Sequence, residues 1–181
     1  MPVSLIAIWA PAPRSGKTSL AQIITEDFPQ FEIRSFADPV KAMAHALLDH
    51  AAIGEREISE ALYGNKTAGI FGLPGSPTGR QLLAGIGNGF GRNMNPEFWA
   101  SLMERRLWRD LRPTVIDDLR FPEELNMVRR CGGQVWHVIR PNLEPLAHPL
   151  CTPDVDLIND GTLDDMRRKA VAILAPQLGG A

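Results

Sequence analysis

Five short, mostly apolar runs recur along the chain, and segments with helical spacing separate them. Short apolar runs bounded by turn residues are typical of buried strands. Strands that alternate with helices build parallel sheets, so the pattern predicts an α/β fold with three layers: a mainly parallel sheet of about five strands with helices on both faces. The strand candidates are residues 3–9, 31–36, 113–118, 134–139 and 156–159.

Helix-start residues mark the segments between these strands. An aspartate or threonine cap and a proline in the first turn favour a helix start. The helix that opens at Asn95-Pro96-Glu97 is expected to hold Phe98, Leu102, Leu107 and Leu111 on or near one face. Further helices are expected through residues 20–24, 38–48 and 55–62, from 120–124 to a Gly132-Gly133 stop, and from Thr162 to residue 174.

Two segments are rich in glycine. Residues 64–79 also contain several prolines and are interpreted as a mobile loop. From Gly85 to Gly91, glycine recurs at every second position, a spacing that does not fit Gly-x-Gly-x-x-Gly and so excludes a Rossmann dinucleotide loop. Each glycine in a helix costs about 1 kcal/mol relative to alanine, so a helical glycine segment indicates close packing or close approach to a ligand.

The composition is that of an ordinary globular protein, and one domain is expected. The chain has 181 residues, of which 44% are hydrophobic and 22% charged. A net charge of −2 argues against a general grip on a nucleic-acid polymer, so any cationic site must be local. Two cysteines, Cys131 and Cys151, are too few for a disulfide framework, and no Cys/His cluster has zinc spacing. The chain shows no signal peptide or membrane span, and a cytoplasmic location is expected.

A candidate phosphate loop follows the first apolar run. The sequence Arg14-Ser15-Gly16-Lys17-Thr18-Ser19 joins that strand to a helix. Such a loop directs backbone N–H groups and the positive end of the helix at a phosphate chain. Gly16 permits close backbone approach, Lys17 supplies positive charge, and the hydroxyl of Thr18 or Ser19 can ligate Mg²⁺. The competing interpretation is a chance Gly-Lys-Thr in a strand-to-helix turn.

The loop departs from the usual phosphate-loop pattern at its start. Pro11 stands where the pattern has glycine, and Pro13 follows two positions later. Prolines stiffen the loop and remove two N–H donors, so Arg14 is expected to supply charge that the backbone does not.

Two acids end the third apolar run. Asp117 and Asp118 lie at the carboxyl end of a strand expected beside the phosphate loop, where an acid can order Mg²⁺. Neighbouring residues of a strand point to opposite sides, so one of the two should face the site, and we assign that position to Asp118. A plain strand-ending turn is the alternative.

With these pieces in place, the chain resembles the deoxynucleoside monophosphate kinases of tailed bacteriophages, within the P-loop nucleotide kinases. The resemblance covers most of the length, and the order and spacing of its motifs carry it. Those motifs are Arg14-Ser15-Gly16-Lys17, residues 35–41, Arg80 with Gly87, Asn95-Pro96-Glu97-Phe98-Trp99, Asp118-Leu119-Arg120-Phe121-Pro122-x-Glu124 and Ile158-Asn159-Asp160-Gly161-Thr162.

The resemblance implies a P-loop kinase that transfers the terminal phosphoryl group of ATP, with Mg²⁺, to a deoxynucleoside monophosphate. Lys17, Arg14, Arg120 and Asp118 are the implied catalytic residues, and Thr18 and Asp118 the implied metal ligands. The implied ATP-binding residues are Ala12, Pro13, Arg14, Ser15, Gly16, Lys17, Thr18, Ser19 and Arg140. The implied substrate-binding residues are Asp38, Lys41, Arg80, Gly87, Asn88, Arg92, Trp99, Asp118, Arg120 and Glu124.

Several of these residues have a plainer interpretation. Helical spacing also suits Trp99 as a core residue, and Asp38 and Lys41 also suit a helix cap and its surface neighbour. Arg92 and Arg140 also suit solvated surface charge. The chain departs from the family at Thr18, where many relatives carry aspartate, and at Ala84 and Asn88, where glutamine and threonine are usual, which leaves base selectivity open.

Domain parts and partners follow from the same resemblance. Residues 1–181 are expected to form one kinase domain, with a monophosphate-binding part at about 37–100 and a short lid at about 140–155. Nucleotides are the expected partners, in the host cytoplasm for a phage-encoded enzyme. Dimers are common among the phage relatives, but no self-complementary face is evident in the sequence.

Three other functions fit the same residues. The first is another small-molecule P-loop kinase that acts on dephospho-coenzyme A or a nucleoside. The second is an NTPase that hydrolyses without an acceptor, and the third is a silent nucleotide-binding module, for which Pro11 and Pro13 are the best argument.

Overall fold

A computed structural model describes residues 3–144 and 150–179. The chain divides into two compact units. The first, the sheet unit, comprises the described residues up to Ser35 and from Ala100 onward; the second, the helical unit, is Phe36–Trp99. The boundaries of the helical unit nearly coincide with the 37–100 segment expected to bind the monophosphate, and that role stays a prediction.

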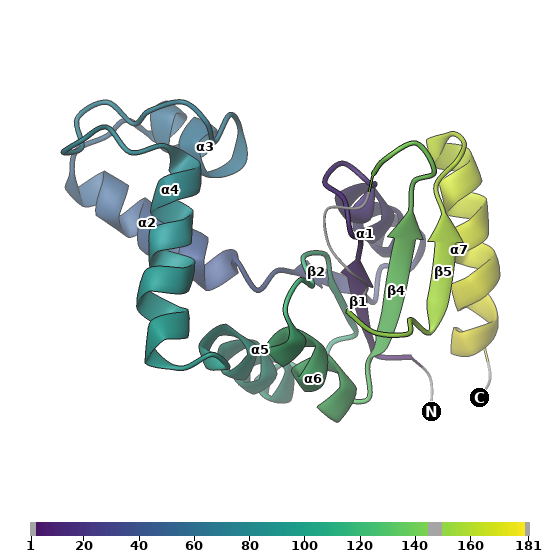
Figure 1. The fold of residues 1–181 in the computed structure, drawn as a ribbon. Coiled ribbons are helices and arrows are strands. Elements are labelled where there is room, and N and C mark those ends of the chain that lie inside the picture. Colours follow the sequence, from purple (N-terminus) through teal and green to yellow (C-terminus); the bar gives the residue numbers. More distant parts are fainter. Residues whose placement is uncertain (1–2, 145–149, 180–181) are drawn as a thin grey trace. The chain divides into compact units, whose positions relative to one another are not determined.

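The sheet unit contains a five-stranded sheet in which every strand is parallel to its neighbours (Figure 1). The strand order is β2-β3-β1-β4-β5, so β1 is central. The prediction of a mainly parallel sheet of about five strands is therefore confirmed. The strands are β1 (Leu5–Trp9), β2 (Glu32–Arg34), β3 (Thr114–Ile116), β4 (Gln134–Ile139) and β5 (Val155–Ile158).

One face of the sheet is covered by α1 (Lys17–Asp27) and α7 (Leu163–Leu178) (Figure 1). Alternate strand residues point to this face, and Ile6 and Ile8 of β1 are fully buried there. Burying an aliphatic side chain of this size contributes about 1.5–3 kcal/mol, so this layer is a main source of stability. The core also contains Leu20, Ile24, Val115, Trp136, Val138, Leu157, Met166, Ala170 and Leu174.

The opposite face carries α6 (Pro122–Arg130). Gly133 shows the fit: a Cβ built on it would lie 2.8 Å from side-chain carbons of both Leu5 on β1 and Val128 on α6. Leu5 alternates with Ile6, so α6 lies across the sheet from α1 and α7. Helices therefore lie on both faces, as the three-layer prediction requires.

The buried face of α5 (Phe98–Arg109) differs from the prediction. Ala100 and Met103 are buried, whereas Leu102 is 41% exposed and Leu111, which lies beyond the helix, is 81% exposed. Leu102 and Met103 are neighbours and both are apolar, so periodicity alone does not fix which of them faces the core.

Four helical segments form the helical unit: α2 (Asp38–His50), α3 (Glu55–Tyr63), α4 (Gly79–Ala84) and η1 (Gly85–Arg92), a π-helix. Their core is small and apolar, and it holds Ala44, Leu48, Ile58, Ala61, Leu62 and Ile70. In residues 3–144 and 150–179, no helix is both long and apolar enough to cross a bilayer.

The segment between α3 and α4 is a loop, as predicted, but it is anchored. The Ile70 side chain is 1% exposed, and its backbone N–H donates to the Pro77 carbonyl at 2.9 Å. Gly69 and Thr78 form an antiparallel bridge, and the Thr78 hydroxyl then caps α4 by accepting from the Gln81 backbone. The mobility expected of this loop stays a prediction.

Gly91, one of the alternate glycines, makes room for an aromatic ring. Trp99 is 3% exposed, and its indole N–H donates to the Gly87 carbonyl at 2.7 Å. A Cβ on Gly91 would overlap the same indole, whereas one on Gly85 or Gly89 would meet no atom within 4 Å. Close packing therefore accounts for glycine at Gly91.

Candidate phosphate-binding site

The loop between β1 and α1 folds into a tight turn despite its prolines. The Ser15 hydroxyl donates to the Ala12 carbonyl at 2.6 Å, and the Ser15 side chain is 2% exposed. Arg14 and Gly16 both have positive φ angles, +60° and +103°. Ser15 therefore closes the turn from inside, and the chain enters α1 directly after Gly16.

Gly16 cannot be replaced without strain. Its φ angle is in the region that favours glycine, and a Cβ would come within 2.7 Å of Asn159 Nδ2 and 2.9 Å of Met166 Cε. The glycine of the phosphate-loop motif is thus required here both for its backbone conformation and for the close approach of its neighbours.

The start of α1 is open to an anion. Gly16 occupies the N-cap position and offers no capping side chain, and the first turn holds no acidic residue. The N–H groups of the first helical turn have no intrahelical acceptor, and the helix dipole places partial positive charge at the same end. A phosphate is the ligand that such an end favours.

Lys17 lies in a cluster of charges that the sequence did not fully predict. Burial is the largest cause lowering the pKa of Lys17, and the positive charge of Arg120 lowers it further. The carboxylates of Asp117 and Asp118 raise that pKa and oppose the shift. Two cations that repel each other at a half-buried position are stabilised by an anion between them.

Asp117 also lies at the candidate site, where Asp118 alone was expected; the magnesium role of Asp118 stays a prediction. The Thr18 hydroxyl donates to Asp117 Oδ2 at 3.3 Å, while both carboxylates act on Lys17. The assumption that only one of the two acids faces the site therefore does not describe this strand end. β3 ends at Ile116, so the alternation rule no longer fixes the directions of the two acids that follow it.

The oxygens of Thr18, Asp117 and Asp118 suit a magnesium ion whose remaining ligands come from substrate phosphates and water. Within the described residues, no group of three or more His, Cys, Asp or Glu side chains is placed to hold a metal alone. Mg²⁺ usually takes one or two protein oxygens and completes its shell with water and phosphate oxygens. The Thr18 hydroxyl with Asp117 and Asp118 supplies such a donor set.

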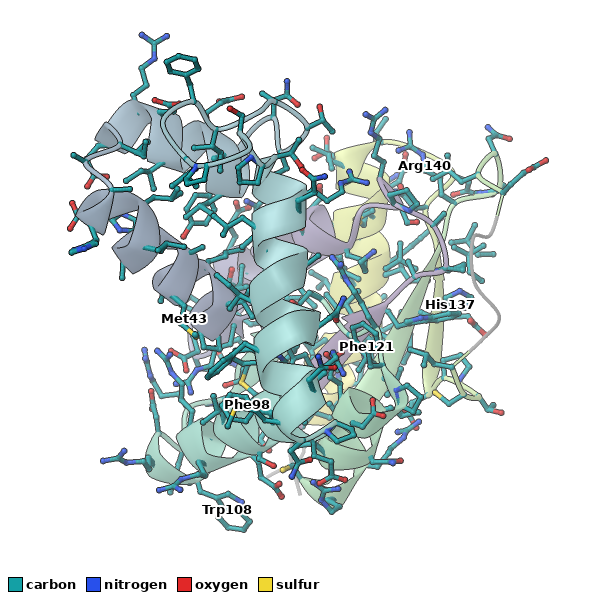
Figure 2. The ribbon with its side chains drawn as sticks, turned by 60° about the vertical axis from the view of Figure 1, so that its left-hand side comes forward. Met43, Phe98, Trp108, Phe121, His137 and Arg140 are labelled. Atoms are coloured by element: carbon teal, nitrogen blue, oxygen red, sulfur yellow. The ribbon has the colours of Figure 1, made fainter. Side chains whose placement is uncertain are left out.

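Two side chains from the C-terminal part of the chain donate hydrogen bonds to the loop backbone. Asn159 Nδ2 donates to the Ser15 carbonyl at 2.8 Å, and its backbone N–H donates to the Ile139 carbonyl at 2.7 Å. Arg140, labelled in Figure 2 just beyond β4, donates from Nη1 to the Arg14 carbonyl at 3.0 Å. Arg140 therefore lies at the predicted ATP loop. Sequence reasoning gave Asn159 no role, although it stands in one of the family motifs.

Glu124 supports the Arg120 segment through the backbone. Its carboxylate is 3% exposed and accepts from the N–H groups of Arg120 at 2.9 Å and Phe121 at 3.1 Å. A buried carboxylate held by two amides caps α6 and fixes the residues before it. These two hydrogen bonds position Arg120, and the substrate contact that the sequence interpretation gave Glu124 stays a prediction.

The helical unit contains the other predicted substrate residues. Trp99 packs as a core residue, because its indole is buried and its N–H donates to the Gly87 carbonyl; its base-stacking role stays a prediction. Lys41 Nζ lies 5.0 Å from the centre of the Tyr63 ring. Asp38 begins α2, Arg80 and Asn88 are exposed, and Arg92 ends η1. The substrate roles of these residues stay predictions.

The predicted lid joins β4 to β5. Residues 145–149 of it lie outside the described residues. At its far end, the Asp154 backbone N–H donates to the Val135 carbonyl at 2.9 Å, and the Asp154 carboxylate pairs with Arg129.

A parallel sheet with a phosphate loop after its central strand, flanked by helices, is the fold of the P-loop kinases. The chain is similar in structure to dephospho-CoA kinase from Campylobacter jejuni, with a TM-score of 0.50 over 98% of each chain. Sequence identity is 16%, so the similarity concerns the fold. No family model and no curated protein matches the sequence.

Proposed function

We propose that this protein transfers the terminal phosphoryl group of ATP to a deoxynucleoside monophosphate. The observation that carries the proposal is that two cations, Lys17 and Arg120, lie close to each other. They lie beside the uncapped start of α1 and the carboxylates of Asp117 and Asp118. Such a constellation suits two phosphate groups that must be brought together against their mutual repulsion.

The acceptor of this reaction needs little activation. A phosphate monoester loses its second proton with a pKa of about 6, so at neutral pH its oxygen is already an anionic nucleophile. What the reaction requires is positive charge on the equatorial oxygens of the transferred group and alignment of donor and acceptor. Lys17 would serve the donor phosphates and Arg120 the acceptor phosphate.

The remaining residues fit the same division of roles. Arg14, Arg140 and the first-turn amides of α1 lie at the loop and would hold the ATP phosphates. Thr18 with Asp117 and Asp118 would hold Mg²⁺, which supplies further charge neutralisation when bound. Asp117 joins Asp118 in this proposal because it contacts Thr18.

A kinase that acts on dephospho-coenzyme A is the second candidate, because the structural neighbour carries that name. The two candidates differ in the nucleophile: the second acceptor presents a hydroxyl group, which needs a general base. Asp117 and Asp118 are the carboxylates near Lys17 that could serve as that base.

One assay separates these functions. Purified protein is incubated with ATP and Mg²⁺, and with each of the four deoxynucleoside monophosphates or dephospho-coenzyme A in turn, and the products are resolved chromatographically. We expect a deoxynucleoside diphosphate together with ADP. Phosphorylation of dephospho-coenzyme A alone would favour the second candidate, and ADP release without any acceptor would favour an NTPase.

Calorimetry with ATP and Mg²⁺ tests the remaining alternative. Absence of binding would indicate a silent module in which Pro11 and Pro13 have closed the loop. The Lys17→Ala variant is the matched control, because binding that persists without the ammonium group does not come from the proposed site.

A further inference from the structure

The arginines of the sheet unit fall into two groups. Within the described residues, seven have a side-chain hydrogen bond or ion pair. The side chains of the other five, Arg14, Arg105, Arg106, Arg109 and Arg120, have neither among those residues. Arg14 and Arg120 belong to the proposed phosphate site, where an incoming ligand would pair them. The paired ones are Arg34, Arg112, Arg129, Arg130, Arg140, Arg167 and Arg168.

The other three unpaired arginines share one stripe of α5. Leu102, Arg105, Arg106 and Arg109 are spaced by three, one and three positions, which places them on the same side of the helix. The stripe is about 10 Å long, given a rise of 1.5 Å per residue. Arginines four positions apart repel each other, so this arrangement weakens the isolated helix unless an anion neutralises it.

A hollow accompanies this stripe. Leu102, Arg105, Arg106, Arg109 and Asp110 line a depression of about 400 Å³. That volume is within the usual range of small-molecule sites, roughly 300–1,000 Å³, and too small for a folded partner. All of its lining residues belong to the sheet unit.

The acid in the lining does not oppose an anion, because its charge is already compensated. Asp110 accepts from Arg34 Nη2 at 2.5 Å and from Arg112 Nε at 3.3 Å, and the hydrogen bond to Arg112 is the largest cause that lowers the pKa of Asp110. Arg34 and Arg112 also pair with Glu32. These four residues sum to zero charge, so the hollow keeps the full positive charge of its three arginines.

We propose that this hollow on α5 is a second anion site, separate from the phosphate loop, that binds the oligophosphate group of a small molecule. Guanidinium forks match phosphate oxygens in bidentate geometry, and three of them can engage neighbouring phosphoryl groups. The net charge of −2 makes a nucleic-acid polymer a poor occupant, since its backbone would extend beyond a stripe of this length onto an acidic protein.

Calorimetric titration with inorganic tripolyphosphate at low ionic strength tests the site. The intact protein should bind two equivalents. The variant Arg105→Gln/Arg106→Gln/Arg109→Gln should bind one, and Lys17→Ala should retain the equivalent that the triple variant loses. Glutamine has a helix propensity close to that of arginine and removes the repulsion, so the triple variant should melt no lower than the parent.

Two further variants keep the test specific. Arg167→Gln/Arg168→Gln removes two paired arginines from α7 and should leave the stoichiometry at two. Arg105→Lys/Arg106→Lys/Arg109→Lys retains the charge without the forks and should weaken binding at this site about tenfold. The site is overturned if the triple glutamine variant still binds two equivalents, and also if a single-stranded oligonucleotide competes at lower concentration than tripolyphosphate.

Discussion

The loop between β1 and α1 in the sheet unit contains a single glycine, whereas in the helical unit glycine recurs at every second position from Gly85 to Gly91. Gly16 is needed for its positive φ angle and for contact with Asn159, and the rest of the loop tolerates two prolines. Gly91 is needed because the Trp99 ring occupies the place of its side chain. The two glycines are therefore needed for different reasons: Gly16 for its backbone conformation and its neighbours, and Gly91 for the ring packed against it.

The two units also place their polar groups differently. Around the phosphate loop, Asn159 and Arg140 donate to backbone carbonyls and hold a conformation that the local sequence does not enforce. In the helical unit, the buried indole N–H of Trp99 donates to the Gly87 carbonyl, so this buried donor has a hydrogen-bond acceptor. The hydrogen bonds from Asn159 and Arg140 hold the candidate phosphate loop, whereas the one from Trp99 belongs to the packing of the helical unit.

The largest expected effect comes from Lys17→Ala. Removing the ammonium group takes away a charge that the transition state needs, and turnover should fall by about 1,000-fold. The fold should remain intact, because Lys17 takes no part in the apolar core. Steady-state kinetics and circular dichroism measure the two quantities, with the α7 surface variant Arg168→Ala as a control. Near-normal turnover in Lys17→Ala would contradict the phosphate site.

A second large effect is expected from Arg120→Ala. Turnover or monophosphate affinity should fall by about 100-fold while the KM for ATP changes little, because Arg120 is assigned to the acceptor. Initial rates over a grid of both substrate concentrations separate the two constants. The assignment fails if the constants for both substrates stay unchanged.

The brace on the phosphate loop should matter less. Asn159→Ala leaves the Ser15 carbonyl without its donor, a cost of about 1–3 kcal/mol that appears as roughly tenfold weaker ATP binding. Asn159→Asp should be worse, since a carboxylate cannot donate and adds negative charge near the phosphates. Asn126→Ala, on the exposed surface of α6, is the control for calorimetry. Equal affinity for ATP in Asn159→Ala, Asn159→Asp and Asn126→Ala would show that the hydrogen bond from Asn159 is dispensable.

In the helical unit, Gly91→Ala should lower stability without touching the phosphate loop. Overlap with Trp99 is expected to cost about 1–3 kcal/mol. Gly89→Ala is the matched control: its Cβ meets no atom within 4 Å, and alanine favours a helix, so stability should stay equal or rise. Thermal melts followed by circular dichroism compare them. An equally stable Gly91→Ala would mean that the glycines do not serve the indole.

The smallest effect concerns pH. Burial and Arg120 lower the pKa of Lys17, so its cationic form is lost at a lower pH than that of a free lysine. Activity that depends on this charge should therefore fall as pH rises through the lowered pKa. Asp117→Asn removes a charge that raises the pKa and should move the alkaline limb to lower pH, and Arg120→Gln should move it to higher pH. Parallel pH–rate profiles with no displacement would refute this coupling.

The sheet and the phosphate loop were predictable because their signals are local. Apolar runs and turn residues mark each strand, and Gly16-Lys17 between a strand and a helix is typical of a phosphate-binding loop. Asn159 and Asp117 were missed because their roles depend on contacts across the sheet. The expected apolar stripe of α5 was wrong for a related reason: tertiary packing, not periodicity, decides which of two apolar neighbours turns inward.

The hydrogen bond from Asn159 to Ser15 joins residues 144 positions apart. During synthesis from the N-terminus, the loop therefore leaves the ribosome long before its brace exists, and even the strands on both sides of β1 come from the second half of the chain. A nascent or C-terminally shortened polypeptide would carry the complete motif without the ability to hold it in shape, so the proposed nucleotide binding would begin only after the C-terminal part of the chain has folded.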